Sequence, residues 1–195
     1  TYINGILLIQ PYLCCIKKII IMTTWKIDNM HSEVGFKVRH MMISNVTGKF
    51  GSFDATLSME NDHLAMAQID FSAEIDSVQT GVADRDGHLK SPDFFDAANH
   101  PTLSFSSNEV VQDGDDWKIT GNMTIKGVSH PVTLKAEFAG IAVDPYGQTK
   151  AGLTLTGKIK RSDFGLTWSA VTEAGNIVVG DEITLISEAQ FVKQG

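Results

Sequence analysis

The chain has little cysteine: its 195 residues include two, Cys14 and Cys15, and both lie within the first 21 residues. From Met22 onward there is none, which excludes disulfides, a thiol nucleophile and cysteine-ligated zinc from that part of the chain. The cysteine content therefore neither requires nor rules out an oxidising compartment.

Positive charge is also scarce, with 16 lysines and arginines against 23 acidic residues and a formal net charge of −7. Because Lys17 and Lys18 lie in the first 21 residues, the rest of the chain has a net charge of −9. This balance provides no positive field for collecting nucleic-acid phosphates or for holding the protein on an anionic membrane through its net charge. We therefore expect no nucleic-acid partner.

Sequence motifs of common catalytic sites are missing as well. There is no G-x-S-x-G nucleophile turn, no phosphate-binding G-x-x-x-x-G-K loop and no G-x-G-x-x-G dinucleotide motif. A metal site formed by His40, His88 and a carboxylate is conceivable, but the six histidines lack the tight spacing of metal motifs. Hydrogen bonds that hold loops are their favoured role, and we expect no metal and no cofactor.

Residues 1–21 lack acidic side chains and an uninterrupted apolar run of about 20 residues, the length of a membrane span. Lys17 and Lys18 follow the apolar residues, whereas in a signal peptide the positive charge comes first. We interpret this segment as upstream sequence translated in error, with Met22 as the native start. A membrane anchor and a structural element are the two alternatives.

From Met22 onward apolar and polar residues alternate, which is the pattern of strands with one buried face. The parity switches at Gly51-Ser52, and this switch predicts a β-bulge. Turn signals such as Lys126-Gly127 separate the runs. The runs cover residues 34–38, 46–50, 53–59, 69–75, 117–125, 128–138, 151–159 and 183–191.

Two longer intervals depart from the alternation. Residues 80–91 fit a short helix with Val82 and Leu89 facing inward, and Pro92 would end it. Residues 162–176 are predicted to form a long loop with one helical turn.

About eight long strands, each with one apolar face, cannot all bury that face in an open sheet. We predict an all-β fold: a closed antiparallel barrel of about eight strands with one short helix between strands. A sandwich of two sheets is the alternative, although its strands are usually about five or six residues long. A barrel of this size either fills with side chains or holds one small ligand.

Six motifs follow one another along the chain. They are Trp25-x-Ile27-Asp28-x-x-His31-Ser32, Val46-x-Gly48-x-Phe50, Asp84-x-Asp86-x-His88-Leu89-Lys90-Ser91, Pro101-x-Leu103-x-Phe105, Gly121-x-Met123-Thr124-Ile125 and Arg161-x-Asp163-Phe164-Gly165-Leu166. In order and spacing these motifs resemble the YceI-like family, and the match runs from about residue 24 to residue 192.

The resemblance implies a lipocalin-like barrel that binds a long polyisoprenoid or fatty chain and pairs as a homodimer. Ile186, on the outward parity of the last strand, would add apolar surface for such a pairing. Many members of the family are exported. We expect a cytoplasmic protein if Met22 is the start, and a periplasmic or membrane-anchored protein is the alternative.

The inward parity of the strands predicts an apolar interior. Each methylene group that leaves water contributes about 0.8 kcal/mol, so a long chain can bind there without a polar anchor. The alternative is that these side chains pack against one another and fill the barrel. The apolar candidates for ligand binding are Val34, Phe36, Val38, Phe50, Phe71, Ile75, Phe105, Ile119, Phe138, Leu155 and Phe191.

Three polar residues complete the candidate ligand site. His40 has the inward parity of its strand, and His88 lies one helical turn after Asp84. Arg85 is the arginine best placed to grip a carboxylate or diphosphate head group with its guanidinium. A surface ion pair with Asp84 or Asp86 is the alternative role for Arg85.

These observations predict a non-enzymatic protein that binds, stores or transports an amphiphilic lipid, with the chain in the barrel and the head group near the loops. Two alternatives remain open. One is an enzyme or isomerase that acts on a lipid-like substrate in the same pocket, with His40 as general base. The other is a stress-response interaction module whose barrel is filled.

Overall fold

The computed structural model describes residues 22–171 and 178–195, so the predicted N-terminal segment, residues 1–21, lies outside the described residues. Strands dominate the described chain, with one α-helix and two short 3₁₀ helices, η1 and η2. The elements are β1 (Met22–Ile27), β2 (Glu33–His40), β3 (Ser44–Phe50), β4 (Phe53–Glu60), β5 (His63–Glu74), η1 (Ile75–Ser77), β6 (Val78–Gln79), α1 (Ala83–Lys90), β7 (Thr102–Asp113), β8 (Asp116–Ile125), β9 (Val128–Val143), β10 (Thr149–Lys160), η2 (Arg161–Phe164) and β11 (Val179–Lys193).

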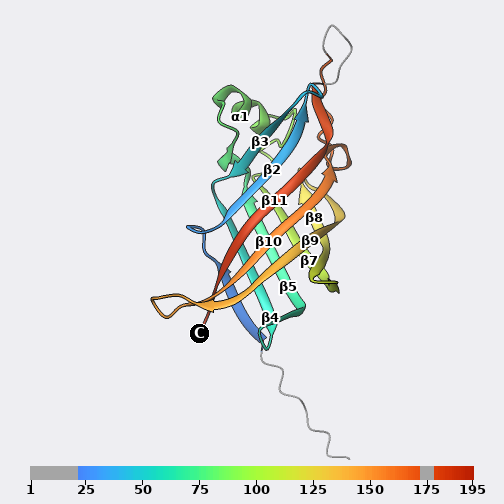
Figure 1. Cartoon of the computed structure of the whole chain (residues 1–195). Coiled ribbons are helices and arrows are strands. Elements are labelled where there is room, and N and C mark those ends of the chain that lie inside the picture. The colour runs from blue at the N-terminus through green and yellow to red at the C-terminus, as the bar shows by residue number, and fades with distance from the viewer. Residues whose placement is uncertain (1–21, 172–177) are drawn as a thin grey trace, which may run out of the picture.

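Eight strands form a closed antiparallel barrel in the order β1-β4-β5-β7-β8-β9-β10-β11, and β11 pairs with β1 to complete the ring (Figure 1). The closing register places Trp25 opposite Lys193 and Ile27 opposite Phe191. The barrel confirms the fold predicted from the sequence. Closure removes the free edges that an open sheet of eight strands would expose.

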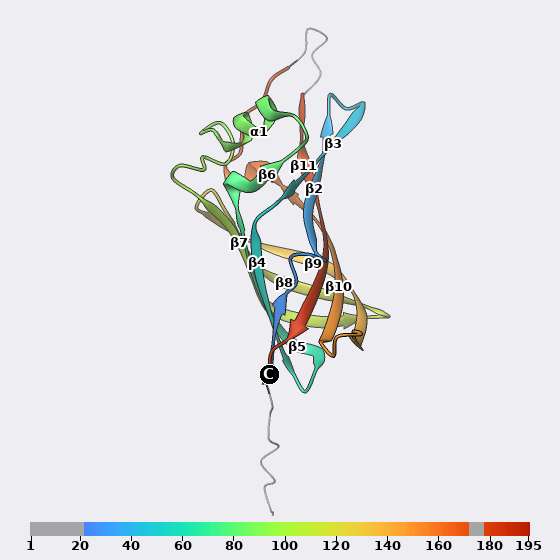
Figure 2. The ribbon, with the colours of Figure 1, turned by 90° about the vertical axis from the view of Figure 1, so that its left-hand side faces the viewer.

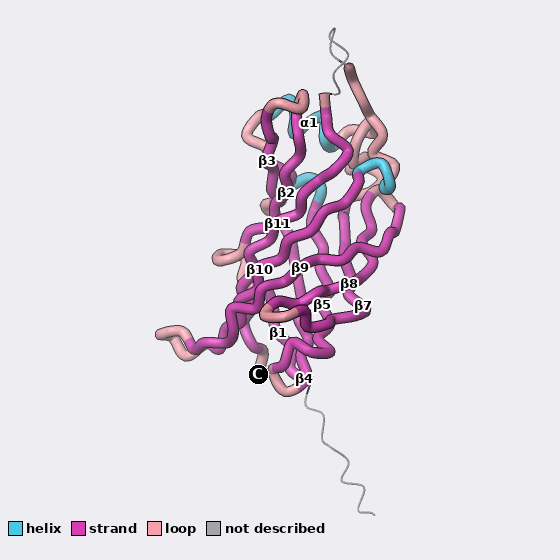
Figure 3. Tube along the Cα trace, turned by 45° about the vertical axis from the view of Figure 1, so that its right-hand side comes forward, coloured by secondary structure: helices cyan, strands magenta, loops and turns pink. Residues whose placement is uncertain are grey.

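At one end the wall continues through β2, β3 and β6. β11 pairs with β2 along its first half, from Val179 opposite His40 to Glu188 opposite Glu33. β3 pairs with β2 and, at its last residues, with β6. Figure 2 shows α1 and β6 at this end, with the C-terminus at the other. We call the end with α1 and β6 the apical end, and the end with the C-terminus the closed end. Figure 3 shows the helical segments gathered toward the apical end.

The predicted β-bulge at Gly51-Ser52 is instead a two-residue break between β3 and β4. The Gly51 N–H donates to the Ser77 carbonyl at 3.0 Å, and the Ser52 carbonyl accepts from the Glu74 N–H at 2.9 Å. The backbone of Gly51 and Ser52 is therefore hydrogen-bonded, but its partners are the last residue of β5 and the turn that follows β5. Phe50 and Phe53 flank the break and are both buried, as the switch in parity requires.

The two-residue hairpin turns have the geometry that their residues favour. Asn61 and Asp62 join β4 to β5 with φ of 50° and 61°, and Lys126 and Gly127 join β8 to β9 with φ of 51° and 76°. Two successive left-handed residues match the right-handed twist of the flanking strands.

The predicted helix within residues 80–91 is confirmed as α1, which ends before Pro92. Its apolar residues do not both face inward, however. Leu89 packs against the core, whereas Val82 is 48% exposed. Val82 precedes the helix in an extended conformation, with φ of −135°, so helical spacing does not set the direction of its side chain.

The interior of the closed end is filled. Trp25, Leu57, Met59 and Leu153 are at most 2% exposed there, and Trp25 lies opposite Leu57 in the β1–β4 register. The Trp25 indole N–H donates to the Thr23 hydroxyl at 3.1 Å, so the buried ring leaves no unmatched donor. This packing confines any open space to the rest of the barrel. None of the described helices is long and apolar enough to span a membrane.

Candidate functional site

A cavity of about 180 Å³ lies inside the barrel, above the packed core of the closed end. Its wall is almost entirely apolar, because the inward faces of the strands supply aliphatic and aromatic side chains. Among the described residues, the only charged side chain at this wall belongs to Arg161. The barrel is therefore not filled by its own side chains throughout, as one of the alternatives required.

Most of the apolar residues predicted for the ligand site lie at this cavity. They come from seven strands, because period-two alternation places every second side chain on the inner face of each strand. They are Val34, Phe36, Val38, Phe50, Phe71, Phe105, Ile119, Leu155 and Phe191.

Two of the apolar candidates pack in or against the core, as predicted, but do not line the cavity. Ile75 is buried, but it begins η1, where the backbone turns to donate its N–H to the Pro101 carbonyl at 2.8 Å. Phe138 lies opposite Leu153, beside a shift in the β9–β10 register, and packs against the core. Ile75 thus lies beyond the regular part of β5, whereas Phe138 keeps the inward parity of β9 and stands at the end of its regular pairing with β10.

The two histidine candidates also lie away from the cavity wall. His40 is the last residue of β2, where its carbonyl accepts the Ile43 N–H at 3.1 Å to form the turn. The His88 ring packs edge-on against Phe94 and Trp168, each at 4.9 Å between ring centroids. An inward general base at His40, the residue that the enzyme alternative needs, is therefore not found.

Arg85, the predicted head-group residue, is engaged within its own segment. Its Nε donates to the Thr80 hydroxyl at 2.7 Å and its Nη2 to the Thr80 carbonyl at 2.8 Å. Asp86 accepts from the Thr80 N–H at 2.8 Å, so the three side chains fix the entry into α1. Among the described residues Arg85 forms no ion pair with Asp84 or Asp86 within 4.0 Å, and its contact with a head group stays a prediction.

The sequence argument missed the cover of the cavity at the apical end. Phe94 and Phe95, from the segment after α1, join Leu89 at the cavity wall. The Phe95 ring lies 6.3 Å from that of Phe50, and the Phe94 ring 5.3 Å from that of Trp168. Because this segment is neither strand nor helix, no periodicity distinguishes its inward side chains; an apolar pair in a polar loop is the one available signal.

Arg161 holds the loop that follows η2. Its side chain donates to the carbonyls of Gly180 at 3.0 Å, Leu166 at 2.5 Å, Trp168 at 2.7 Å and Val179 at 3.3 Å. Burial lowers its pKa, while the nearby Asp181 charge acts in the opposite direction. The guanidinium still remains charged, because its ordinary pKa is far above neutrality. Arg161 therefore ties the loop to β11 instead of presenting a free anchor to a ligand.

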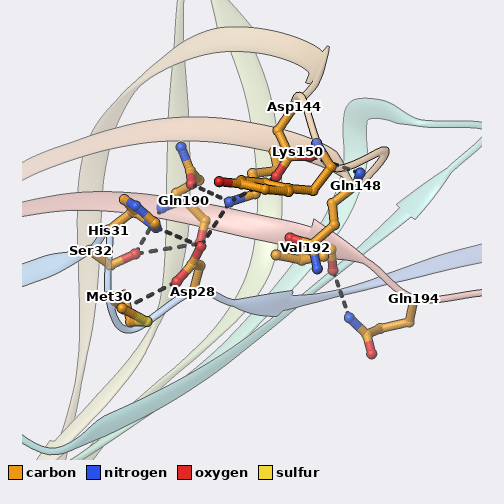
Figure 4. A network of polar contacts seen from close by, with 11 residues as sticks. Asp28, Met30, His31, Ser32, Asp144, Gln148, Lys150, Gln190, Val192 and Gln194 are labelled. Atoms are coloured by element: carbon orange, nitrogen blue, oxygen red, sulfur yellow. Dashed lines mark hydrogen bonds and ion pairs between the residues drawn. The ribbon is translucent and has the colours of Figure 1, made fainter.

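A groove of about 890 Å³ lies outside the barrel, beside the seam where β11 meets β1. Lys150 is at the centre of its polar network: Nζ lies 3.0 Å from Asp28 Oδ2, 3.2 Å from Gln190 Oε1 and 3.5 Å from Asp144 Oδ2 (Figure 4). Asp28 Oδ2 also lies 2.8 Å from His31 Nδ1. The network thus joins the loop after β1, the β9–β10 hairpin and β11.

The charges of this network support one another. Burial alone would raise the pKa of Asp28, but hydrogen bonds from His31 and Lys150 outweigh it and lower that pKa. A hydrogen bond from the Gln148 N–H lowers the pKa of Asp144, and the hydrogen bond to Asp28 raises the pKa of Lys150. Asp28, Asp144 and Lys150 are therefore charged at neutral pH and act as a structural clasp across the seam. Within the described residues, no group of three or more His, Cys, Asp or Glu side chains is arranged to hold a metal ion.

A closed eight-stranded barrel with an apolar cavity, in which the one charged side chain among the described wall residues already donates to backbone carbonyls, defines a class of small hollow β-barrel proteins. The chain belongs to the YceI-like family: the model of the YceI-like domain matches residues 25–191. This confirms the resemblance seen in the sequence motifs.

Three comparisons illustrate the membership. The chain is 37% identical over 172 residues to Protein YceI of Escherichia coli, and the match covers 87% of each chain. It is similar to the crystal structure of the YceI protein of Campylobacter jejuni, with a TM-score of 0.69, 34% identity and coverage of 78% of this chain and 88% of that one. It also shares the fold of a polyisoprenoid binding domain from Saccharophagus degradans, with a TM-score of 0.60, 13% identity and coverage of 87% and 98%.

Proposed function

We propose that the protein binds a long-chain lipid of the polyisoprenoid or fatty-acid type in the barrel cavity, and that it stores or carries this lipid without changing it chemically. The observation that carries the proposal is the cavity wall, where nearly every described side chain is apolar and Arg161 already donates to backbone carbonyls. A wall of this kind favours a hydrocarbon chain and offers nothing to a charged or hydrogen-bonding substrate.

The energy of chain burial favours a long ligand over a short one. Ten methylene groups that leave water contribute about 8 kcal/mol, whereas association costs at least about 4 kcal/mol in lost freedom. Tight binding therefore requires a chain well beyond ten carbons. The structural neighbour described as a polyisoprenoid binding domain supports a branched chain of this kind.

The test compares two phenylalanines, of which one lines the cavity and one does not. After delipidation, the wild-type protein should bind fluorescent fatty-acid and prenyl probes. Phe71→Leu changes the shape of the cavity wall and should shift the preference among chains of different length or branching, at a stability cost of about 1–2 kcal/mol. Phe138→Leu, a half-buried position away from the cavity, is the matched control and should leave the preference unchanged.

A wild-type protein that binds none of these probes after delipidation and refolding would contradict the proposal. Equal shifts in probe preference for the two variants would also contradict it, because the effect would then not depend on the cavity.

A further inference from the structure

The β2–β3 turn presents apolar side chains to solvent at the apical end. Met42 is 57% exposed and Ile43 is 77% exposed. Met41 and Met42 have φ of 49° and 62°, a left-handed conformation that methionine rarely adopts. Soluble proteins usually place glycine or asparagine at such positions. The turn therefore combines an unfavourable backbone conformation with exposed apolar side chains, and this combination motivates a functional hypothesis that needs further support.

A third exposed apolar residue lies beside this turn. The Met41 N–H donates to the Val178 carbonyl at 2.8 Å, and the Val178 N–H donates to the Ala170 carbonyl at 2.9 Å. Val171, which follows Ala170, is 69% exposed. We call Met42, Ile43 and Val171 the apical patch.

The apical patch lies close in the chain to the apical part of the cavity wall. Val38, two residues before the end of β2, lines the cavity, and so does Val179, the first residue of β11. His40 lies opposite Val179 in the β2–β11 register, and the turn that carries Met42 begins immediately after it. The apical patch is therefore separated from cavity-lining residues by only a few residues of the chain.

Positive charge is distributed unevenly between the two ends. Among the described residues, Lys37, Arg39 and Lys160 have no carboxylate within 4.0 Å at the apical end. Lys158 pairs there with Glu182 at 2.8 Å, and Asp181 accepts hydrogen bonds from the Ser162 N–H and hydroxyl. Lysines on the rest of the barrel form ion pairs with Asp or Glu; they are Lys26, Lys118, Lys135, Lys150 and Lys193. The unpaired cations therefore lie at the end that carries the apical patch.

We propose that the apical patch docks on an anionic phospholipid bilayer, and that the lipid passes between this bilayer and the cavity. The inference rests on the proposed function, because a long-chain lipid is held in membranes and has almost no free concentration in water. Exposed Met and Ile side chains would enter the boundary between head groups and acyl chains, while Lys37, Arg39 and Lys160 contact anionic head groups. The net charge of −9 over residues 22–195 opposes binding to anionic lipid elsewhere on the molecule, so docking depends on these cations together with the apolar side chains of the apical patch.

The first test is flotation of the delipidated protein with vesicles of phosphatidylcholine, with and without phosphatidylglycerol. The wild-type protein should float with the anionic vesicles. The double variant Met42→Ser/Ile43→Ser should bind at least about tenfold more weakly, the loss expected when one large apolar side chain no longer leaves water. The matched control is Met66→Ser, because Met66 is 76% exposed and has a similar φ of 69° but lies on β5. Arg39→Gln should reduce the difference between the two vesicle types.

The second test separates the docking inference from the proposed function. A fluorescent prenyl probe is loaded into anionic vesicles, and its transfer to the protein is followed at several vesicle concentrations. Docking predicts a transfer rate that rises with vesicle concentration and falls about tenfold in Met42→Ser/Ile43→Ser, although this variant binds probe from solution as the wild type does.

A transfer rate independent of vesicle concentration, with normal probe binding from solution, would overturn docking and leave the proposed function intact. Loss of probe binding in the wild type would overturn the proposed function. Equal flotation of wild type and double variant, or no flotation with either vesicle type, would overturn docking whatever the probe does.

Discussion

Two glycines of the YceI-like motifs face different surroundings in the barrel. A Cβ at Gly121 would overlap the Ser106 carbonyl and would lie 2.7 Å from both Ser107 Cα and Phe105 Cζ. A Cβ at Gly48 would meet the Phe36 ring, with Cε1 at 2.8 Å. Backbone cannot move aside as a side chain can, so these two positions tolerate an added methyl group to different degrees.

We therefore expect Gly121→Ala to destabilise the protein by about 1–3 kcal/mol, because the β7 backbone must shift. Gly87→Ala is the control, for which we expect a change in stability of the opposite sign. It lies in α1 with no atom within 4 Å of the added Cβ, and it should stabilise by about 0.4–1 kcal/mol through the lower entropy of the unfolded chain. Urea unfolding of the two variants measures both effects, and a neutral Gly121→Ala would show that the barrel wall is looser than described.

At the scale of the elements, the sequence predicted regular segments well and irregular ones poorly. Phe36, Phe71 and Phe105 could be placed because their strands keep a strict period of two over their inner faces. Phe94 and Phe95 could not, because the cover of the cavity follows no period. The contacts of Arg161 were equally out of reach, since they depend on carbonyls brought together by the loop after η2 and the start of β11.

The seam between β11 and β1 makes the stability depend on pH. Asp28 and Asp144 have lowered pKa values in the folded protein, so the stability they contribute is complete above their unfolded pKa of about 4 and is lost as the pH falls through the lowered values. Lys150 has a raised pKa, so its contribution is complete below the unfolded value of about 10.4 and is lost as the pH rises through the folded one.

We therefore expect the melting temperature to fall in acid, and to fall less steeply in Lys150→Met, which lacks the central cation of the clasp. Lys26→Met is the control, because Lys26 and Asp54 form an exposed pair with side chains 48% and 66% accessible. Parallel acid profiles of wild type and Lys150→Met, measured by circular dichroism, would argue against this clasp.

At the scale of the whole molecule, the barrel closes within residues 22–195. β1 begins at Met22, and its pairing with β4 starts there, with Met22 opposite Glu60. Removal of residues 1–21 should therefore leave the melting temperature and probe uptake unchanged. A large fall in melting temperature, measured by calorimetry on the two chains, would show that the segment is a structural element. The homodimer implied by the family resemblance stays a prediction at this scale.

The central claim is that the apolar cavity holds a lipid chain, and native mass spectrometry of protein purified from its own host tests it most directly. The account predicts a species heavier than the chain by the mass of one long-chain lipid, and delipidation should remove this species. It should also be much reduced in folded Phe71→Asp protein, because this substitution places a carboxylate at the cavity wall. Protein that carries no lipid from its host, and takes up none after delipidation, would contradict the account.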